Sequence, residues 1–252
     1  MSERKIVPQS GDNRVTLEKV KNNKNVKSLI YAANDYLEVR GYTEHGLRHV
    51  GFVSKTTANI LRELGYDERV IELGAIAGWL HDIGNSVNRK NHGLTGAAVA
   101  HSLLREMKMD TQEIAVIMAA IGNHEEEYGI PVNPVSAALI LADKADAHRT
   151  RVRMGQYDPD DIHDRVNYSI KKNFLVIDKE HRVVRLVIFM DDTSSMMEYF
   201  QIYLTRMVLS ESAAAFLKCR YELVINDVVI NNHRSAPKKL SLAESEKAVS
   251  EE

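Results

Sequence analysis

Apolar residues recur at helical spacing through the first half of the 252-residue chain. Residues 53–64 place their apolar side chains on one face, and residues 93–107 show the same pattern. Residues 70–80 are apolar on nearly every side, which is typical of a helix buried at the centre of a bundle. The spacing therefore predicts a mainly α fold, with a helical bundle over residues 25–153.

The pattern changes beyond this bundle. Two short runs of β-branched and aromatic residues, 174–177 and 183–189, are joined by a polar turn and predict a hairpin. Helical spacing returns over residues 196–217, and residues 221–230 predict a further strand with a polar interruption. We expect a small α+β unit that packs on the bundle. The expected boundaries are a tail and lead-in helix at 1–24, the bundle at 25–153, the α+β unit at 154–231 and a disordered tail at 232–252.

Charge and cysteine content exclude several classes of partner and site. The chain has 33 Lys and Arg against 35 Asp and Glu, whereas nucleic-acid binders carry a strong basic excess, so nucleic acid is not an expected partner. Cys219 is the single cysteine, which excludes an internal disulfide and a cysteine-based zinc site. The N-terminal segment lacks the apolar core of a signal peptide, and no stretch approaches the roughly 18 apolar residues of a membrane span. We expect a soluble cytoplasmic protein.

Several of the ten histidines lie, together with aspartates, at or just beyond the ends of the predicted helices. Imidazole and carboxylate suit Zn, Fe, Mn and similar ions, so short connections could gather a metal site at one end of the bundle. A single histidine on an apolar helix is more often a hydrogen-bonded core residue. The pair His81-Asp82 differs, because it ends the apolar helix over 70–80, where unpaired polar groups would cost a few kcal/mol. The candidate ligands are His49, His81, Asp82, His92, His124 and Asp143.

The order of these residues resembles that of the HD-domain metal-dependent phosphohydrolases. The motif of that family is a histidine, then a histidine-aspartate pair, then a distant aspartate, and His49, His81-Asp82 and Asp143 match it. The 32 residues from His49 to His81 fall in the usual range of the family, and the resemblance covers roughly residues 27–153. It implies a helical HD domain in which these four side chains hold one metal ion.

A branch of the family with two metal ions adds two histidines between the pair and the last aspartate. His92 and His124 stand at those places. The resemblance implies one or two divalent ions per chain (Fe, Mn, Zn, Ni, Co or Mg), with Asp82 bridging to a second ion that His92 and His124 hold. A divalent ion lowers the pKa of a bound water to about 7, and two ions about 3.5–4 Å apart can bind both the attacking and the leaving oxygen of a phosphoester.

Residues beside the ligands are candidates for assisting roles. His45 lies four residues before His49, the offset at which the cyclic-nucleotide phosphodiesterases, which share the HD architecture, place a proton-donating histidine; the alternative is a solvated helix start. Lys144, next to Asp143, could neutralise phosphate oxygens, and its alternative is a solvated face. Asp146, on the same face as Asp143, is a candidate for orienting a ligand. The catalytic candidates are Asp82, His45 and Lys144.

Two charged runs flank the second pair of histidines. Arg89-Lys90 precedes His92 and could also neutralise phosphate oxygens. The acidic run at 125–127 follows His124 and is a candidate for orienting that imidazole. For both runs the alternative interpretation is a plain solvent-facing surface.

We expect a hydrolase that cleaves a phosphomonoester, phosphodiester or phosphoanhydride of a small phosphorylated molecule, foremost a nucleotide. The chain has no Gly-x-Ser-x-Gly elbow and no Walker loop, so a metal-activated hydroxide is the expected nucleophile. Asn85 stands where many cyclic-di-GMP-degrading members have lysine, which argues against a cyclic-dinucleotide substrate. Two alternatives stay open: a di-iron oxygenase with the same ligands, and a non-catalytic, metal-stabilised regulatory protein that forms a homodimer through its C-terminal unit.

Overall fold

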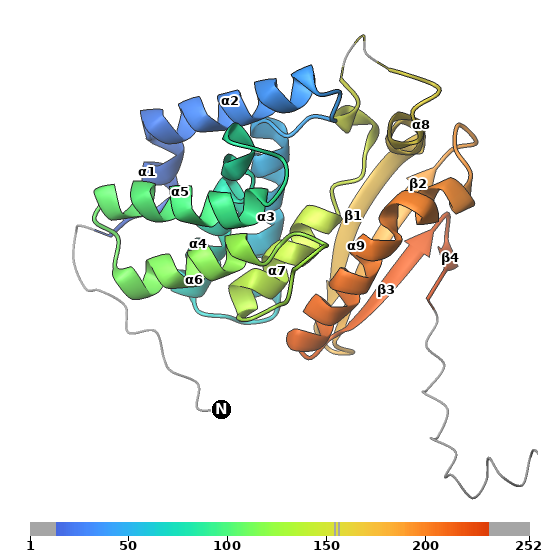
Figure 1. Cartoon of the computed structure of the whole chain (residues 1–252). Helices are drawn as coiled ribbons and strands as arrows, with labels where there is room; N and C mark the ends of the chain where they lie inside the picture. The colour runs from blue at the N-terminus through green and yellow to red at the C-terminus, as the bar shows by residue number, and fades with distance from the viewer. Residues whose placement is uncertain (1–13, 154, 156, 232–252) are drawn as a thin grey trace, which may run out of the picture.

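The structure is a computed structural model that describes residues 14–231 with the exception of 154 and 156. The tail predicted over 232–252 and the first 13 residues of the segment predicted over 1–24 lie outside the described residues. The first part of the chain is helical (Figure 1). Its elements are α1 (Leu17–Asn22), α2 (Lys24–Val39), α3 (Leu47–Glu63), α4 (Glu68–Leu80), the 3-10 helix η1 (Ile83–Ser86), α5 (His92–Glu106), α6 (Thr111–Gly122) and α7 (Pro134–Lys144).

A small α+β part follows the helical part. The predicted fold class, mainly α with a small α+β unit at the C-terminal side, is therefore confirmed. The elements of the second part are the 3-10 helix η2 (Arg149–Arg151), α8 (Ile162–Ser169), β1 (Ile170–Asp178), β2 (Val183–Met190), α9 (Met196–Phe216), β3 (Arg220–Ile225) and β4 (Val228–Val229).

Helix α4 forms the centre of the helical part, as its apolar sequence predicts. Every residue from 73 to 80 is buried, and the helix packs against α3, α6 and α7. A β-carbon at Gly78 would lie 2.7 Å from the Cα atom of Ser54, so only glycine lets α3 and α4 approach this closely. Because a short connection makes the two helices antiparallel, the first turn of α3 meets the end of α4. This contact brings His49 next to His81.

The sheet of the C-terminal part has the strand order β1-β2-β3-β4 within the described residues. β1 and β2 form the predicted antiparallel hairpin, while β2 and β3 pair in parallel with α9 as the crossover. The prediction of a single strand over 221–230 is wrong. Asn226 and Asp227 have φ values of 47° and 66°, a left-handed pair that turns the chain back, so β3 and β4 form a second hairpin.

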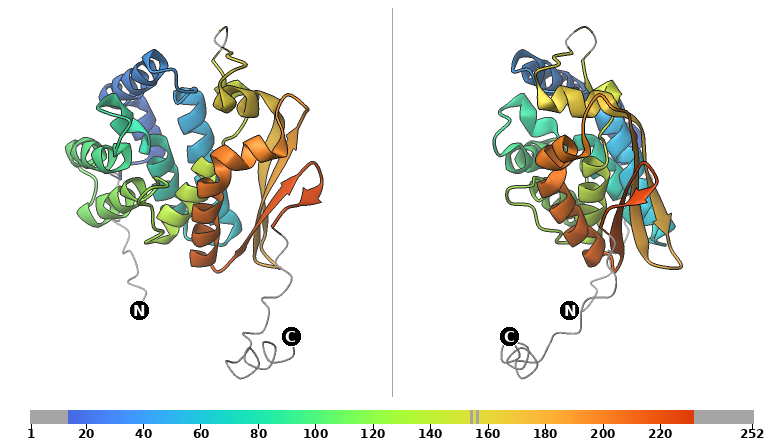
Figure 2. Two further views of the ribbon diagram at one scale, coloured as in Figure 1. Left: turned by 45° about the vertical axis from the view of Figure 1, so that its right-hand side comes forward. Right: turned by 90° about the vertical axis from the view of Figure 1, so that its right-hand side faces the viewer.

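The two parts share one core. A continuous cluster of buried apolar residues runs from α2 and α4 into β2, α9 and β3. Figure 2 shows α9 between the sheet and α7, and α9 contacts both α7 and β3. The C-terminal part therefore has a fixed place against the helical part. Among the described residues, no helix has the length and apolar character needed to cross a membrane.

Candidate metal centre

The six predicted ligands lie together at one end of the helical part, each at a helix terminus. Five of them are buried, and the side chain of Asp143 is 13% exposed. The short connections between the helices thus gather these residues, as predicted from the sequence. His49 lies in the first turn of α3, His81 and Asp82 between α4 and η1, His92 at the start of α5, His124 just after α6 and Asp143 in the last turn of α7.

In the first group, four ligand atoms face one another. The Nε2 atoms of His49 and His81 are 3.2 Å apart, and Asp82 Oδ2 lies 3.4 Å from each of them. Asp143 Oδ1 lies 3.4 Å from His49 Nε2 and 3.6 Å from His81 Nε2. Two ligand atoms bound at about 2.1 Å to one ion are about 3.0–3.4 Å apart at octahedral or tetrahedral angles. The four residues therefore fit a divalent ion.

The second group lies on the other side of Asp82. His92 Nε2 is 3.1 Å from His124 Nε2 and 3.2 Å from Asp82 Oδ1, while His124 Nε2 is 4.0 Å from that oxygen. Asp82 thus directs one oxygen to each group. Its Oδ2 atom is buried without a hydrogen-bond partner among the described residues, which is costly for a carboxylate unless a cation binds it. Together these groups could hold a metal ion.

All four histidines are oriented through their Nδ1 atoms. Each Nδ1 faces an oxygen acceptor and therefore donates a hydrogen bond, which leaves the lone pair of the neutral ring on Nε2, directed at the cluster. In neutral rings such lone pairs would repel one another at 3.1–3.2 Å, so each pair of Nε2 atoms favours a cation between them, either a proton or a metal ion. The acceptors are Asp146 Oδ2 for His49 (2.6 Å) and the carbonyls of Gly78 for His81 (2.9 Å), Arg89 for His92 (3.0 Å) and Ile121 for His124 (2.6 Å).

The surroundings shift the pKa values of these histidines in opposite directions. Burial, followed by the charge of Arg151, lowers the pKa of His49, but hydrogen bonds to aspartates raise it to about 10. Burial also opposes protonation of His92, and its carboxylate neighbours raise the pKa to about 9. Burial and the neighbouring His92 lower the pKa of His124 to about 3. Protons on His49 and His92 therefore compete with a metal ion for the same Nε2 atoms.

Asp146 supports His49 from behind. Its Oδ2 accepts the His49 Nδ1 hydrogen bond, and its two oxygens also accept hydrogen bonds from Arg48 at 3.1 and 2.8 Å. Burial raises the pKa of Asp146, but the hydrogen bond with His49 and the charge of Arg151 hold it well below its usual range. The carboxylate is thus ionised, and it fixes the ring with Nε2 facing the cluster.

The acidic run after His124 contacts a different histidine from the one predicted. Glu125 Oε2 lies 3.2 Å from His92 Nδ1, and Glu125 Oε1 accepts a hydrogen bond from the Gly93 backbone at 2.5 Å. The prediction that this run orients His124 is wrong, because His124 Nδ1 already donates to the Ile121 carbonyl. The chain leaves α6 at His124 and passes the start of α5, which places Glu125 beside His92.

His45 lies in the loop before α3, beside the His49 ring. Since α3 begins at Leu47, His45 does not share its face, and it is only 7% exposed, which excludes a solvated helix start. Its Nδ1 donates to the Thr43 carbonyl at 2.6 Å, and its Nε2 accepts a hydrogen bond from Arg151 at 2.8 Å. Burial and the charge of Arg151 lower the pKa of His45 well below its usual value. The ring is therefore neutral, with no proton on Nε2.

Lys144 is buried against the cluster and not on a solvated face. Its Nζ donates to Asp143 Oδ2 at 2.7 Å and lies 2.9 Å from Glu126 Oε1. Burial raises the pKa of Asp143, but the charge of Lys144 holds it well below its usual range. Lys144 thus binds one oxygen of Asp143 while the other faces the histidines. Arg206 of α9 also contacts Glu126, at 3.1 Å, which extends this ion-pair chain to the C-terminal part.

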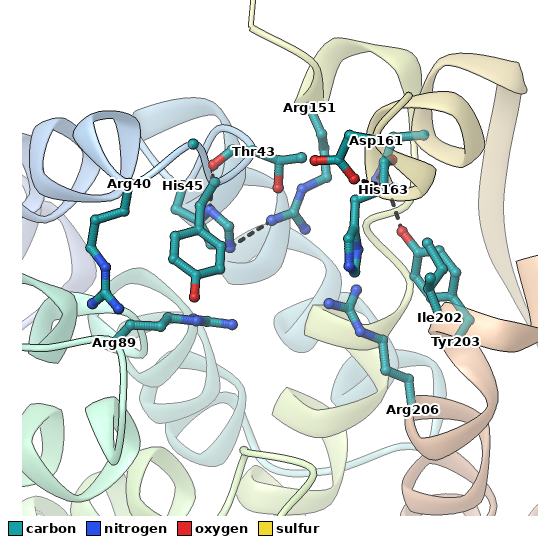
Figure 3. Close-up of a pocket in the computed structure, with 13 residues that line it drawn as sticks. Arg40, Thr43, His45, Arg89, Arg151, Asp161, His163, Ile202, Tyr203 and Arg206 are labelled. Atoms are coloured by element: carbon teal, nitrogen blue, oxygen red, sulfur yellow. Dashed lines mark hydrogen bonds between the residues drawn. The ribbon is translucent and has the colours of Figure 1, made fainter. Parts of the chain in front are cut away.

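A cavity of about 380 Å³ lies between the helical part and helices α8 and α9 (Figure 3). Arg40, Arg89, Arg151 and Arg206 line it. Behind it, a smaller pocket reaches the aspartates of the cluster, and both spaces share His45 and three of the arginines. Of these four arginines, only Arg89 is a candidate from the sequence. Single arginines are common on surfaces, and no local spacing distinguishes the other three.

Comparison with known proteins adds no further identification. No protein-family model matches the chain. No curated protein gives a significant match either. What the chain shows is a helical domain with a buried cluster of histidines and aspartates that could bind metal, an arrangement compatible with an HD domain.

Proposed function

We propose that the protein is an HD-type metal-dependent phosphohydrolase that cleaves a phosphate ester or phosphoanhydride of a small molecule, foremost a nucleotide. The observation that carries this proposal is the convergence of six side chains, in the order of the HD motif, on one buried cluster that an arginine-lined cavity reaches. Ligand types, spacing of the ligand atoms and access for an anionic substrate support the same chemistry.

The chain provides the groups that this reaction needs around a metal ion. A divalent ion held by the cluster would supply a water that ionises near neutral pH and a positive charge next to the phosphoryl oxygens. Asp82 directs an oxygen to each group of histidines. Lys144 and Arg89 line the pocket beside the cluster, where they can neutralise charge that develops on a phosphoryl group.

The cavity also distinguishes a hydrolase from a non-catalytic protein with a structural metal site. A purely structural metal site is closed by its protein ligands, whereas here a pocket lined by Asp82 and Asp143 joins a larger cavity. This favours a catalytic site over a metal that only stabilises the fold. The arginines favour an anionic substrate. An oxygenase with the same ligands would require iron and molecular oxygen. Metal analysis and oxygen consumption therefore distinguish it from a hydrolase.

The test compares wild type with Asp82→Ala and with Asp67→Ala, a matched control at an exposed position before α4 whose side chain makes no capping hydrogen bond. All three proteins are purified without chelator, analysed for metals, tested for oxygen consumption and assayed on phosphomonoesters, phosphodiesters and phosphoanhydrides. We expect wild type and control to bind metal and hydrolyse at least one class, and Asp82→Ala to lose the activity while keeping its helical circular dichroism. Full activity in Asp82→Ala, or iron-dependent oxygen consumption without hydrolysis, would overturn the proposal.

A further inference from the structure

The cavity in front of the cluster carries more positive charge than one phosphoryl group requires. Arg40, Arg89, Arg151 and Arg206 line it, against a single carboxylate, that of Asp161. Asp161 is already in use, because its Oδ1 accepts a backbone hydrogen bond at the start of α8. Guanidinium groups stay charged at any physiological pH. The cavity walls therefore hold an excess of fixed positive charge.

Two of these arginines have no carboxylate partner within the described residues. Arg40 donates to the side-chain oxygen of Asn88 at 3.4 Å. Arg89 donates to the side-chain oxygen of Asn85 at 3.4 Å and lies 3.3 Å from His92 Nε2. Neither arrangement neutralises the positive charge of the guanidinium. An anionic ligand in the cavity would do so at both positions.

Arg151 gives an independent indication of an anionic ligand. The residue is only 3% exposed, and its Nε is buried without a hydrogen-bond partner among the described residues. One terminal nitrogen donates to the neutral His45 ring and the other to the Asp146 backbone carbonyl at 2.9 Å. The carboxylate nearest to Arg151, that of Asp146 at 3.6 Å, also binds Arg48 and His49. The buried Nε atom costs free energy unless a further acceptor reaches it.

The arginines are distributed along the cavity and not gathered at one point. Arg89 and Arg206 extend from opposite walls, and Arg151 points into the space from a third side (Figure 3). These three arginines also line the pocket at the cluster. Of the two spaces, Arg40 lines only the outer cavity. A ligand whose phosphoryl group reaches the cluster would therefore present a different part of itself to Arg40.

We infer that the substrate carries two anionic phosphate groups, of which one reaches the cluster and the other binds Arg40 in the outer cavity. The role of the first phosphate rests on the proposed function, whereas binding of the second depends on Arg40. Tyr42 and Tyr203 line the same cavity, with the Arg40 and Arg206 guanidinium groups 5.6 and 4.7 Å from their rings, and offer apolar surface to the organic part. A cavity of about 380 Å³ suits a ligand of nucleotide size.

The experiment uses three phosphonates, which are not hydrolysed, as calorimetric probes of the metal-loaded full-length protein. Propylphosphonate carries one anionic group. Methylenediphosphonate carries two adjacent groups, as in a phosphoanhydride, and propane-1,3-diphosphonate carries two separated groups, as in a molecule phosphorylated at two positions. Arg40→Gln is compared with wild type and with Arg105→Gln, a matched exposed arginine at the end of α5 that does not line the cavity.

We expect at least one diphosphonate to bind wild type and Arg105→Gln about tenfold more tightly than propylphosphonate does. Arg40→Gln should lose most of this difference while its affinity for propylphosphonate stays unchanged, and the preferred diphosphonate indicates the spacing of the two groups. Chelation of metal by the probes in solution is the same for all three proteins. Equal binding of one and two phosphonate groups by wild type overturns the inference, and so does a diphosphonate preference that survives in Arg40→Gln.

The outcome is separable from that of the proposed function, because no probe turns over. If the hydrolysis assay fails while Arg40 still discriminates between one and two phosphonates, the cavity binds a molecule with two anionic groups for another purpose. If hydrolysis is found but all three probes lose affinity equally in Arg40→Gln, the enzyme proposal stands and the second-phosphate site is overturned.

Discussion

At the scale of single residues, Asp146 holds His49 in place through one hydrogen bond of 2.6 Å. We expect Asp146→Asn to weaken metal binding by about 10–100-fold, because a neutral amide supports the imidazole less well and removes the carboxylate charge nearest to Arg151. Titration against a competing chelator measures this change. Asp67→Asn is the matched control, and an affinity that is equal in wild type and Asp146→Asn would contradict the orienting role.

His45 gives a second prediction at this scale. Its Nε2 accepts a hydrogen bond from Arg151, so we expect His45→Ala to lower turnover by a similar factor for nitrophenyl and alkyl phosphates, as loss of a positioning contact would. His45→Gln, whose amide oxygen can accept the same hydrogen bond, should recover part of the activity. A general acid would instead contribute about 10²–10⁴-fold for alkyl leaving groups and little for nitrophenyl groups. A selective loss with the alkyl esters would establish the proton-donor role predicted from the sequence.

The ligands could be predicted from the sequence because their side chains carry the chemistry and their order is informative. Of the groups that orient them, Asp146 could be predicted from its spacing to Asp143, whereas the backbone carbonyls could not. His81, His92 and His124 each donate to a backbone carbonyl three residues earlier, and a carbonyl is present at every position of a chain. Arg151 lies near the cluster because its backbone oxygen accepts a hydrogen bond from Glu44, a residue far away in sequence. The spacing of neighbouring residues in the sequence does not predict such a long-range contact.

At the scale of elements, the contact between η1 and α5 decides whether Asp82 and His92 face each other. A β-carbon at Gly84 would lie 2.0 Å from the His92 carbonyl oxygen and 2.5 Å from the Gly96 nitrogen. Backbone atoms cannot rotate away, so we expect Gly84→Ala to separate the two elements, destabilise the fold by about 1–3 kcal/mol and lower the metal content per chain.

Thermal unfolding and elemental analysis measure both effects of Gly84→Ala. Gly122→Ala is the control, because a β-carbon there would meet only side-chain atoms at 3.8 and 3.9 Å, which are ordinary contacts. We expect this control to keep the stability and metal content of wild type. A Gly84→Ala protein that also keeps both would contradict the view that the contact between η1 and α5 assembles the second group of ligands.

Elements with a long or unambiguous pattern could be predicted, and short ones could not. Residues 70–80 of α4 are apolar on nearly every side, and α9 spans 21 residues, so each helix has many positions that fit the helical pattern. Helix α8 follows an acidic turn and has only eight residues, which are too few to show a clear helical pattern. The second hairpin is missed for another reason: Asn226 and Asp227 adopt left-handed backbone conformations, whereas a polar pair alone is equally compatible with a continuous strand.

At the scale of the whole molecule, the candidate site belongs to both parts of the chain. Arg206 comes from α9, and its ion pair with Glu126 connects through Lys144 to the helical part. The C-terminal part thus supplies one wall of the cavity. Both parts could be predicted from the sequence, but the cavity between them could not, because their relative placement depends on packing between residues far apart in the chain. A homodimer through the C-terminal part stays a prediction.

Protons and metal ions compete for the cluster, and this competition predicts how stability depends on pH. The pKa values of His49 and His92 in the folded protein are raised to about 10 and about 9, above the value of about 6.5 for histidine in an unfolded chain. Protonation of these rings therefore stabilises the metal-free fold fully below about pH 6.5, and this contribution is lost as the pH rises through about 9–10.

The metal-loaded protein should behave in the opposite way, because metal ligation requires neutral Nε2 atoms and becomes tighter as the protons leave. We therefore expect the difference in Tm between metal-loaded and EDTA-treated, dialysed protein to be small at about pH 6 and to widen up to about pH 9. Scanning calorimetry at constant ionic strength measures this difference, and titration with metal in two buffers of unequal ionisation enthalpy measures the protons released. A difference in Tm that does not change with pH, or metal binding without proton release, would mean that the ion binds elsewhere than at His49 and His92.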